Sequence, residues 1–279
     1  MYPVMDEILQ RAVICRPRRR IAKSLIFIVL LALLHISATA QSIRTIHVFV
    51  ALADNAHQGI VPVPAKLGNG DDPFHNLYWG AAAGVKTFFA RSAEWQLLPV
   101  HSQTKAAILE RCIFKHRKQN VYLIADAYQG SQIQQAIMDF FSAAAGTSAE
   151  QVSVGTEAHP LTLPAAGGAN LVAYVGHDGL MEFQLSNPPQ KQNTMRPQAI
   201  VLACTSKVFF ADPMRASGAY PLLWTTGLMA PEAYTLKSAV DGWILHEGNE
   251  QIRTRAAEAY DKYQKCGIKG ARRLLVSGW

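Results

Sequence analysis

Cysteine is scarce in this chain, with four residues in 279. A small disulfide-stapled scaffold, which uses cysteine densely, is therefore excluded. Charged residues are also few, at 17%, whereas hydrophobic residues reach 49%. Disordered chains show the opposite balance, so the sequence predicts a globular protein with a sizeable core. Only one apolar stretch approaches the length of a membrane span, and we find no internal repeat or low-complexity segment.

Several motifs of common enzyme classes are missing. The chain has no Gly-x-Ser-x-Gly elbow, which argues against an α/β-hydrolase. It has neither a phosphate-binding Gly-x-x-x-x-Gly-Lys-Ser/Thr loop nor a His-Glu-x-x-His zinc helix. No Gly-x-Gly-x-x-Gly follows the first expected strand, so a dinucleotide site is not expected. We therefore expect no cofactor.

The N-terminus has the three parts of a secretory signal peptide. Six Lys and Arg residues precede the apolar run 24–36, and Ala38-Thr39-Ala40 follows it. An apolar core of this length is shorter than the roughly 20 residues of a spanning helix. The sequence thus predicts a signal peptide over 1–40 and an exported protein, periplasmic or extracellular. The alternative is an uncleaved N-terminal anchor, which would be the protein's only contact with a membrane.

The net charge of +7 mostly reflects this segment. Six of the 27 basic and two of the 20 acidic residues lie in 1–40, which leaves +3 for the rest. No basic stripe with interleaved aromatic residues remains, so a nucleic-acid partner is not expected.

Short apolar strands alternate with amphipathic helices through residues 41–279. The pattern predicts strands over 43–51, 120–127, 171–176, 199–203 and 221–226, and helices over 77–95, 104–118, 131–145, 231–243 and 253–264. Continuous apolar strands of this kind are typical of a parallel sheet covered on both faces. We expect one α/β domain, an α/β/α sandwich with a mostly parallel sheet of five to six strands. Its core spans about 43–265, and a basic C-terminal tail follows.

Two of the expected strands end in side chains that suit catalysis. His177 follows the strand over 171–176, and Cys204 follows the strand over 199–203. If these strands are neighbours, imidazole and thiol emerge at the same sheet edge, where sites form in open α/β sheets. A nearby His helps to generate the nucleophilic thiolate. Gly179 lacks a Cβ and would let backbone N–H groups approach an oxyanion.

The two strand ends resemble those of the caspase-like cysteine peptidases, the group of caspases, metacaspases, legumain, clostripain and gingipains. Leu-Val-Ala-Tyr-Val-Gly precedes His177, and Ala-Ile-Val-Leu-Ala precedes Cys204, in the same order as in that group. The resemblance implies a caspase-like fold that cleaves peptide bonds. It makes Cys204 the nucleophile and His177 the proton donor to the leaving amine. The oxyanion would lie on N–H groups near Gly179 and Cys204.

Asp178 after the His and Thr205-Ser206 after the Cys depart from the family pattern. They support an alternative function, a catalytically lapsed caspase-like binding or scaffold protein of the cell envelope. An envelope amidase that uses the same two residues is a third possibility. The expected partner of the first hypothesis is a peptide or protein substrate. The sequence leaves the oligomeric state open.

Two further segments contain candidate residues for the substrate pocket. Asp54 follows the first strand and could hold a basic substrate side chain, although an Asx turn is the simpler interpretation. Trp224, Thr225 and Thr226 end the fifth strand and could line a substrate groove, or serve as core and turn residues. Glu232 begins a helix, where a carboxylate suits the helix dipole, and is given no catalytic role.

Two remaining features involve possible cross-links and metals. Cys112 and Cys266 could pair and leave Cys204 as the free thiol. Asp71, Asp72 and His75 are possible metal ligands, but they lack a calcium-loop spacing. Asp72-Pro73 is instead typical of a helix start, so no metal site is expected.

Overall fold

The computed structural model describes residues 42–100, 104–156, 159–192 and 197–279. The predicted signal peptide, residues 1–40, lies outside these ranges. Residues 43–279 form one compact unit. Within the described ranges, no helix combines the length and the apolar composition that a membrane crossing requires.

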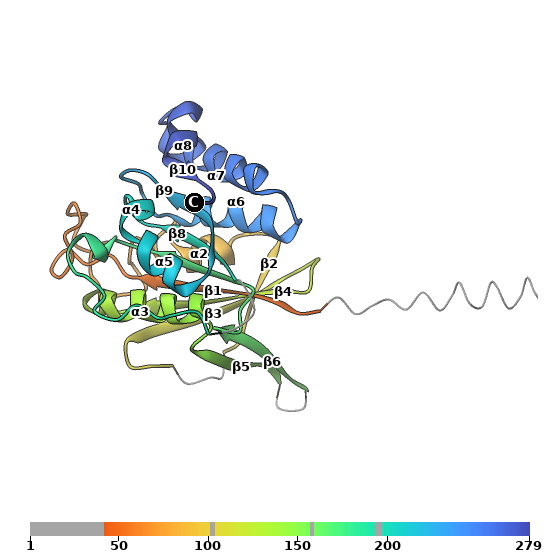
Figure 1. The fold of residues 1–279 in the computed structure, drawn as a ribbon. Helices are drawn as coiled ribbons and strands as arrows, with labels where there is room; N and C mark the ends of the chain where they lie inside the picture. Colours follow the sequence, from red (N-terminus) through yellow and green to blue (C-terminus); the bar gives the residue numbers. More distant parts are fainter. Residues whose placement is uncertain (1–41, 101–103, 157–158, 193–196) are drawn as a thin grey trace, which may run out of the picture. The chain divides into compact units, whose positions relative to one another are not determined.

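The fold is α/β, with ten strands and seven α-helices in the described residues (Figure 1). The strands are β1 (Arg44–Ala51), β2 (Trp95–Leu98), β3 (Ile108–His116), β4 (Val121–Tyr128), β5 (Ala149–Thr156), β6 (His159–Ala166), β7 (Leu171–Val175), β8 (Gln198–Leu202), β9 (Tyr220–Thr225) and β10 (Leu275–Val276). The helices are α2 (Val85–Ala90), α3 (Ile133–Ala145), α4 (Ser206–Phe209), α5 (Ala211–Ser217), α6 (Ala233–Ile244), α7 (Asn249–Gln264) and α8 (Ile268–Leu274). Short 3₁₀ turns occupy η1 (Gly130–Gln132) and η2 (Gly179–Met181).

Eight strands form the central sheet in the order β10-β9-β8-β7-β1-β4-β3-β2. The five strands from β9 to β4 run parallel, whereas β10 pairs antiparallel with β9, β3 with β4, and β2 with β3. The expected α/β fold is therefore confirmed, but the sheet is larger than the expected five to six strands and is mixed, because three of its pairings are antiparallel. The parallel centre is right, and the additional strands lie at the edges.

The five predicted strands are confirmed as β1, β4, β7, β8 and β9. The helix predicted over 131–145 is α3, and Gly146 ends it with φ +73°, the left-handed conformation that glycine adopts freely. The helices predicted over 231–243 and 253–264 are α6 and α7, the latter beginning four residues earlier.

Two helix predictions are wrong. Residues 104–118 contain β3, which pairs antiparallel with β4, and Arg111 of β3 binds the buried carboxylate of Asp126 across this pairing. No local pattern reveals such a pairing between strands. Of residues 77–95, only Val85–Ala90 are helical. Turns come first because the Asn76 side chain binds the backbone of Ala53 and Tyr78.

The sheet is covered on both faces, as strands that are apolar on both sides require. Val48 and Val50 of β1 face the cluster formed with α2, α6 and α7, whereas Phe49 and Ala51 face α3 and α5. Figure 1 shows α6 and α7 together, and α3 beside α5. The β5–β6 hairpin packs a third cluster against Ile113 and Ile124.

The basic C-terminal segment, expected to be a tail, continues the fold. It forms α8 and then β10, which pairs antiparallel with β9. The Trp224 indole N–H donates to Gly278 O at 3.0 Å, and the Trp224 ring meets that of Trp279 edge-on at 5.3 Å. These contacts bind the end of the chain to the sheet.

Candidate active site

The strand order creates one natural place for a site. β1 is followed outward by β4 on one side and by β7, β8 and β9 on the other. The chain thus reverses its direction of winding between β1 and β7. In open α/β sheets, ligands bind outside the carboxyl ends of the strands at such a switch point. A ligand site is therefore expected among the residues that follow β1, β7 and β8.

A cavity of about 400 Å³ opens at this edge of the sheet. Both predicted catalytic residues, His177 and Cys204, line it. Its walls are mostly apolar: Ile60 and Val61 come from the loop after β1, Leu77 from the turns before α2, Met181 from η2, and Leu228 and Met229 from the loop after β9. Such a mixture of apolar walls and a few polar groups is typical of small-molecule and side-chain pockets.

His177 is nearly buried and is held in one orientation. Its Nε2 lies 2.6 Å from Glu182 Oε1, and its carbonyl oxygen accepts the Tyr174 hydroxyl at 2.7 Å. An ionised carboxylate can only accept, so Nε2 carries the hydrogen in that contact. Nδ1 is then the ring nitrogen left for a reacting group.

The same Glu182 oxygen also binds the loop after β1. The Gly59 N–H donates to Glu182 Oε1 at 2.7 Å, and a Cβ at Gly59 would lie 2.1 Å from that oxygen. Only glycine fits there without displacing the carboxylate. One oxygen atom therefore holds both the imidazole and a wall of the cavity.

Cys204 lies on a sharp turn between β8 and α4. The next residue, Thr205, has φ +50°, a backbone conformation that is rare for residues other than glycine or asparagine. Ser206 stabilises this turn, because its buried hydroxyl forms a hydrogen bond of 3.0 Å with the hydroxyl of Thr225. The outcome is a half-buried thiol at the cavity wall.

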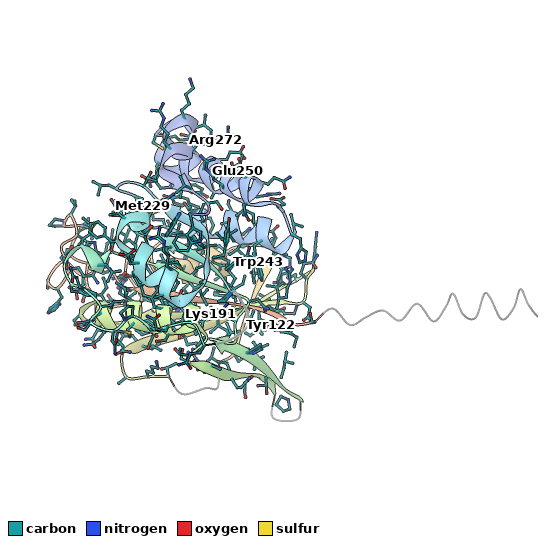
Figure 2. All side chains as sticks on the ribbon, in the orientation of Figure 1. Tyr122, Lys191, Met229, Trp243, Glu250 and Arg272 are labelled. Carbon is teal, nitrogen blue, oxygen red and sulfur yellow. The ribbon has the colours of Figure 1, made fainter. Side chains whose placement is uncertain are left out.

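The thiol is held by the loop after β9, in which Figure 2 labels Met229. The Met229 N–H donates to Cys204 Sγ at 3.4 Å, and the Met229 carbonyl lies 3.6 Å from the sulfur. No hydrogen bond joins Cys204 to His177 in the part of the chain that the structure describes. The two groups thus share a cavity without touching.

Gly176, the residue that follows β7, allows the carboxyl end of β7 to lie close to that of β1. Gly176 has φ +156°, and a Cβ there would lie 3.0 Å from Ala51 O. Its N–H donates to Leu202 O at 3.2 Å, which ties the end of β7 to β8. The residue before His177 is therefore required to be small.

The other predicted oxyanion residue lies in a tight turn. The Gly179 N–H donates to His177 O at 3.1 Å, and a Cβ at Gly179 would meet the Phe183 ring at 2.7 Å. Gly179 is buried and is not among the residues that line the cavity.

The four predicted pocket residues lie outside the cavity lining. Asp54 forms an Asx turn, in which Oδ1 accepts the Ala56 N–H at 2.9 Å. Trp224 and Thr225 are fully buried. Thr226 is exposed and donates its hydroxyl hydrogen to Arg273 O at 2.7 Å. The structure thus brings His177 and Cys204 together but does not bring these four to the same cavity.

Two carboxylates of the site were not among the residues predicted from the sequence to take part in it. Glu182 reaches His177 from η2 and touches Gly59, which lies 123 residues away in the chain. Glu232 lines the cavity beside Gln264, although its position suggested only a helix start. For Glu182, the one available signal was a carboxylate five residues after His177.

A third carboxyl group, that of Asp178, is fully buried next to His177. Its Oδ1 accepts the Leu180 N–H at 3.1 Å, and its Oδ2 has no hydrogen-bond partner in the described structure. Burial, with a smaller contribution from the nearby Glu182 charge, raises the pKa of Asp178 to about 7.

The described cysteines are all free: Cys112 is buried, Cys204 half-buried and Cys266 exposed. The considered Cys112–Cys266 disulfide is therefore not formed. Burial raises the pKa of Cys112 to about 12, which makes this thiol inert.

The considered metal ligands of the 68–75 loop are used otherwise. Asp72 Oδ2 lies 2.6 Å from His75 Nδ1, whereas Asp71 accepts the Gln129 amide at 2.6 Å. Across the described ranges, no group of three or more His, Cys, Asp and Glu side chains is placed to hold a metal ion.

Comparison of the chain with protein families, with curated proteins and with solved structures finds no match. The site must therefore be interpreted from its own geometry.

Proposed function

We propose that this protein is an exported cysteine peptidase of the caspase-like kind, with Cys204 as nucleophile and His177 as acid–base group. One observation supports the proposal above all. The side chains that end two neighbouring parallel strands, β7 and β8, line a single cavity beside the switch point of the sheet.

The chemistry follows from the two groups. The Cys204 thiolate attacks the substrate carbonyl carbon, and the C–N bond breaks as His177 gives a proton to the departing amine. Water then hydrolyses the thioester and restores the thiol. Nδ1 is the nitrogen proposed to transfer the proton, because Glu182 occupies Nε2. Glu182 is proposed to orient the ring and to stabilise the imidazolium.

The oxyanion is proposed to bind the backbone N–H of Cys204. Participation of Gly179, which the family resemblance implies, requires its hydrogen bond to His177 O to open. Preorganised N–H donors of this kind typically supply a large part of the rate enhancement.

The free cysteines offer a test with an internal reference. The protein is treated with iodoacetamide at pH 6, and the alkylation rate of each cysteine is measured by mass spectrometry. Cys266 is exposed, and the one hydrogen bond of its thiol within the described ranges goes to Gly267 O, so it serves as the reference for an accessible thiol. We expect the half-buried Cys204 to react faster than Cys266. We expect this advantage to be lost in His177→Ala.

Turnover is tested on a peptide library with Cys204→Ala and Cys266→Ala as a matched pair. We expect cleavage to vanish in the first variant and to persist in the second. Cleavage that survives Cys204→Ala would refute the proposed mechanism.

A second candidate is a non-catalytic binding protein. It is favoured by the fact that both groups already have partners: His177 binds Glu182, and the Cys204 sulfur lies between the N–H and C=O of Met229. In that case Cys204 reacts more slowly than Cys266, and His177→Ala leaves its rate unchanged.

A further inference from the structure

The last helix of the fold has a strongly basic outer surface. From Lys262 to Trp279 the chain contains five Lys or Arg residues and no Asp or Glu. Four of the five lie in the turn between α7 and α8 or on α8, and all four are exposed: Lys265, Lys269, Arg272 and Arg273. We call these four residues the α8 patch. Figure 1 shows α8 at the opposite end of the molecule from the β5–β6 hairpin, and Figure 2 labels Arg272 there.

The protein does not neutralise the charges of the α8 patch. None of its four cations forms an ion pair within the described residues, whereas the neighbouring Arg255 of α7 binds Glu247. The nearest acidic residue before the patch, Asp261, uses its carboxylate to accept the Gly267 N–H at 2.7 Å. Exposed cations that gather on one surface without partners create a positive potential, which attracts an anionic partner.

The outer face of α8 is open. Ala271 is buried and marks the face that packs on the rest of the fold. Successive residues of an α-helix lie about 100° apart, so Lys269 and Arg273 are opposite Ala271 and Arg272 lies to one side. A Cβ at Gly270 would meet no other atom within 4 Å in the described structure. The cations are therefore presented on a surface that no described element covers.

Exposed apolar side chains border the α8 patch. Ile268 on α8 itself is 37% exposed, and Leu228 in the loop after β9 is 75% exposed. This loop is joined to the end of α8, because the Thr226 N–H donates to Leu274 O at 2.9 Å. Apolar side chains gain little from a purely polar partner, such as a nucleic-acid backbone or an acidic peptide. They gain from the acyl boundary that lies just below the headgroups of a bilayer.

We propose that the α8 patch docks this protein on a lipid bilayer with anionic headgroups. The four cations bind the lipid phosphates, and Ile268 and Leu228 enter the layer beneath them. This contact is separate from the N-terminal segment, which was the only membrane contact expected from the sequence. Leu228 also lines the cavity of Cys204 and His177, so docking brings the mouth of that cavity next to the bilayer. A docking surface needs no catalysis, so the inference does not depend on the proposed peptidase function.

The size of the patch suits this partner. Clusters of about four to eight Lys and Arg residues on a helix are typical of proteins that bind anionic lipids. Each such residue near the surface strengthens binding about fivefold. Removing two charges should therefore weaken binding about 25-fold, a change that a vesicle assay measures easily.

The first experiment is sedimentation with vesicles, using residues 41–279. This form keeps the compact unit over 43–279 and lacks the apolar run 24–36, which would bind any bilayer by itself. A cooperative urea transition checks that it is folded. We expect vesicles with about one phosphatidylglycerol in three lipids to bind it at least tenfold more tightly than pure phosphatidylcholine. This binding should be lost between about 0.1 M and about 1 M salt, where the Debye length falls from about 10 Å to about 3 Å.

Two matched double variants locate the surface. Lys269→Gln with Arg272→Gln should weaken binding to the anionic vesicles at least tenfold. Arg117→Gln with Lys118→Gln removes the same two types of charge at exposed residues of the turn between β3 and β4. We expect the affinity of this control to stay within about threefold of the parent. Equal losses in both variants, no loss in the first, or equal binding to both kinds of vesicle would overturn the proposal.

The second experiment distinguishes a bilayer from a soluble polyanion. An environment-sensitive fluorophore is attached to Cys266, which is exposed between Lys265 and Ile268, in a Cys204→Ala background. We expect its emission to shift to the blue with the anionic vesicles and to be quenched by spin-labelled lipid. Double-stranded DNA and polyglutamate should leave the emission unchanged. A response to either polyanion as large as the response to vesicles would identify a different partner and overturn the membrane proposal.

Discussion

A buried ion network beside β1 offers the sharpest test of how the sheet is stabilised. Asp126 on β4 is 1% exposed and accepts Arg111 Nε at 2.5 Å and Arg111 Nη2 at 2.6 Å. It also lies 3.0 Å from His47 Nε2, while His47 Nδ1 accepts the Ala166 N–H at 2.8 Å. Burial raises the pKa of Asp126, but the hydrogen bonds from Arg111, together with His47, outweigh it and hold that pKa below its usual range.

Asp126→Asn removes the charge with little change in shape. Breaking a buried ion pair on one side costs roughly 3–5 kcal/mol. Arg111 keeps a second partner, Glu150, at 2.5 Å, and the Glu150 side chain is 37% exposed. We therefore expect the lower end, a loss of about 3 kcal/mol in the free energy of unfolding. This is a large share of the roughly 5–15 kcal/mol of a typical domain.

The assay is equilibrium unfolding in urea at neutral pH, with a matched control. Asp212→Asn makes the same change at a carboxylate that is 96% exposed and whose ion pair in the described structure is with Arg215. We expect no measurable effect there, because such surface pairs contribute little. The midpoint of Asp126→Asn should fall at an unchanged urea slope. A loss below about 1 kcal/mol would refute the view that the network is an essential buried pair.

A double variant distinguishes the cost of an unpaired buried charge from the cost of altered side-chain packing. Arg111→Met combined with Asp126→Leu removes both charges and leaves neither buried without a partner. We expect this variant to be more stable than Asp126→Asn, since apolar replacement of a buried pair is often neutral. A double variant that is less stable than the single one would indicate that packing, and not charge, determines the result.

Three further predictions concern the site. In Glu182→Gln we expect kcat to fall about a hundredfold while KM changes little, because the imidazole loses the group that orients it and stabilises its charge; an unchanged kcat would exclude a positioning role. The raised pKa of Asp178, about 7 against about 4 in an unfolded chain, means that the folded protein binds the extra proton. Stability should therefore fall by about 4 kcal/mol as pH rises from about 4 to about 7, and Asp178→Asn should remove this fall in urea titrations; parallel pH profiles for both proteins would contradict the assignment. Gly176→Ala brings a Cβ to 3.0 Å from Ala51 O at φ +156° and should cost about 1–3 kcal/mol, so an unchanged melting temperature would disprove the close approach.

Local patterns were enough to predict the centre of the fold. Each of the five parallel strands is a short apolar run, because a strand buried on both faces has no polar side. The helix that ends at Gly146 has both a periodic apolar face and a residue that tolerates positive φ. His177 and Cys204 could be predicted as neighbours because the carboxyl ends of parallel strands share one edge of the sheet.

The edges of the sheet could not be predicted in this way. The segment of β3 was predicted as a helix, and it is a strand because it pairs along its length with β4 on one side and β2 on the other. The final strand, β10, is two residues long and exists because β9 offers it a free edge. Both depend on contacts between residues far apart in the chain.

The sequence by itself determined the alternation of strands and helices and the two strand ends that carry an imidazole and a thiol. Those features follow from side-chain periodicity, which acts over a few residues. The tertiary structure alone decided that Glu182 holds the imidazole and the loop at Gly59 together, and that Glu232 and not Asp54 lines the cavity. It also decided that Asp178 is buried with one oxygen, Oδ2, lacking a hydrogen-bond partner among the described residues. These outcomes depend on where loops meet after the chain has folded, and loop conformation is set by long-range hydrogen bonds that no local pattern encodes.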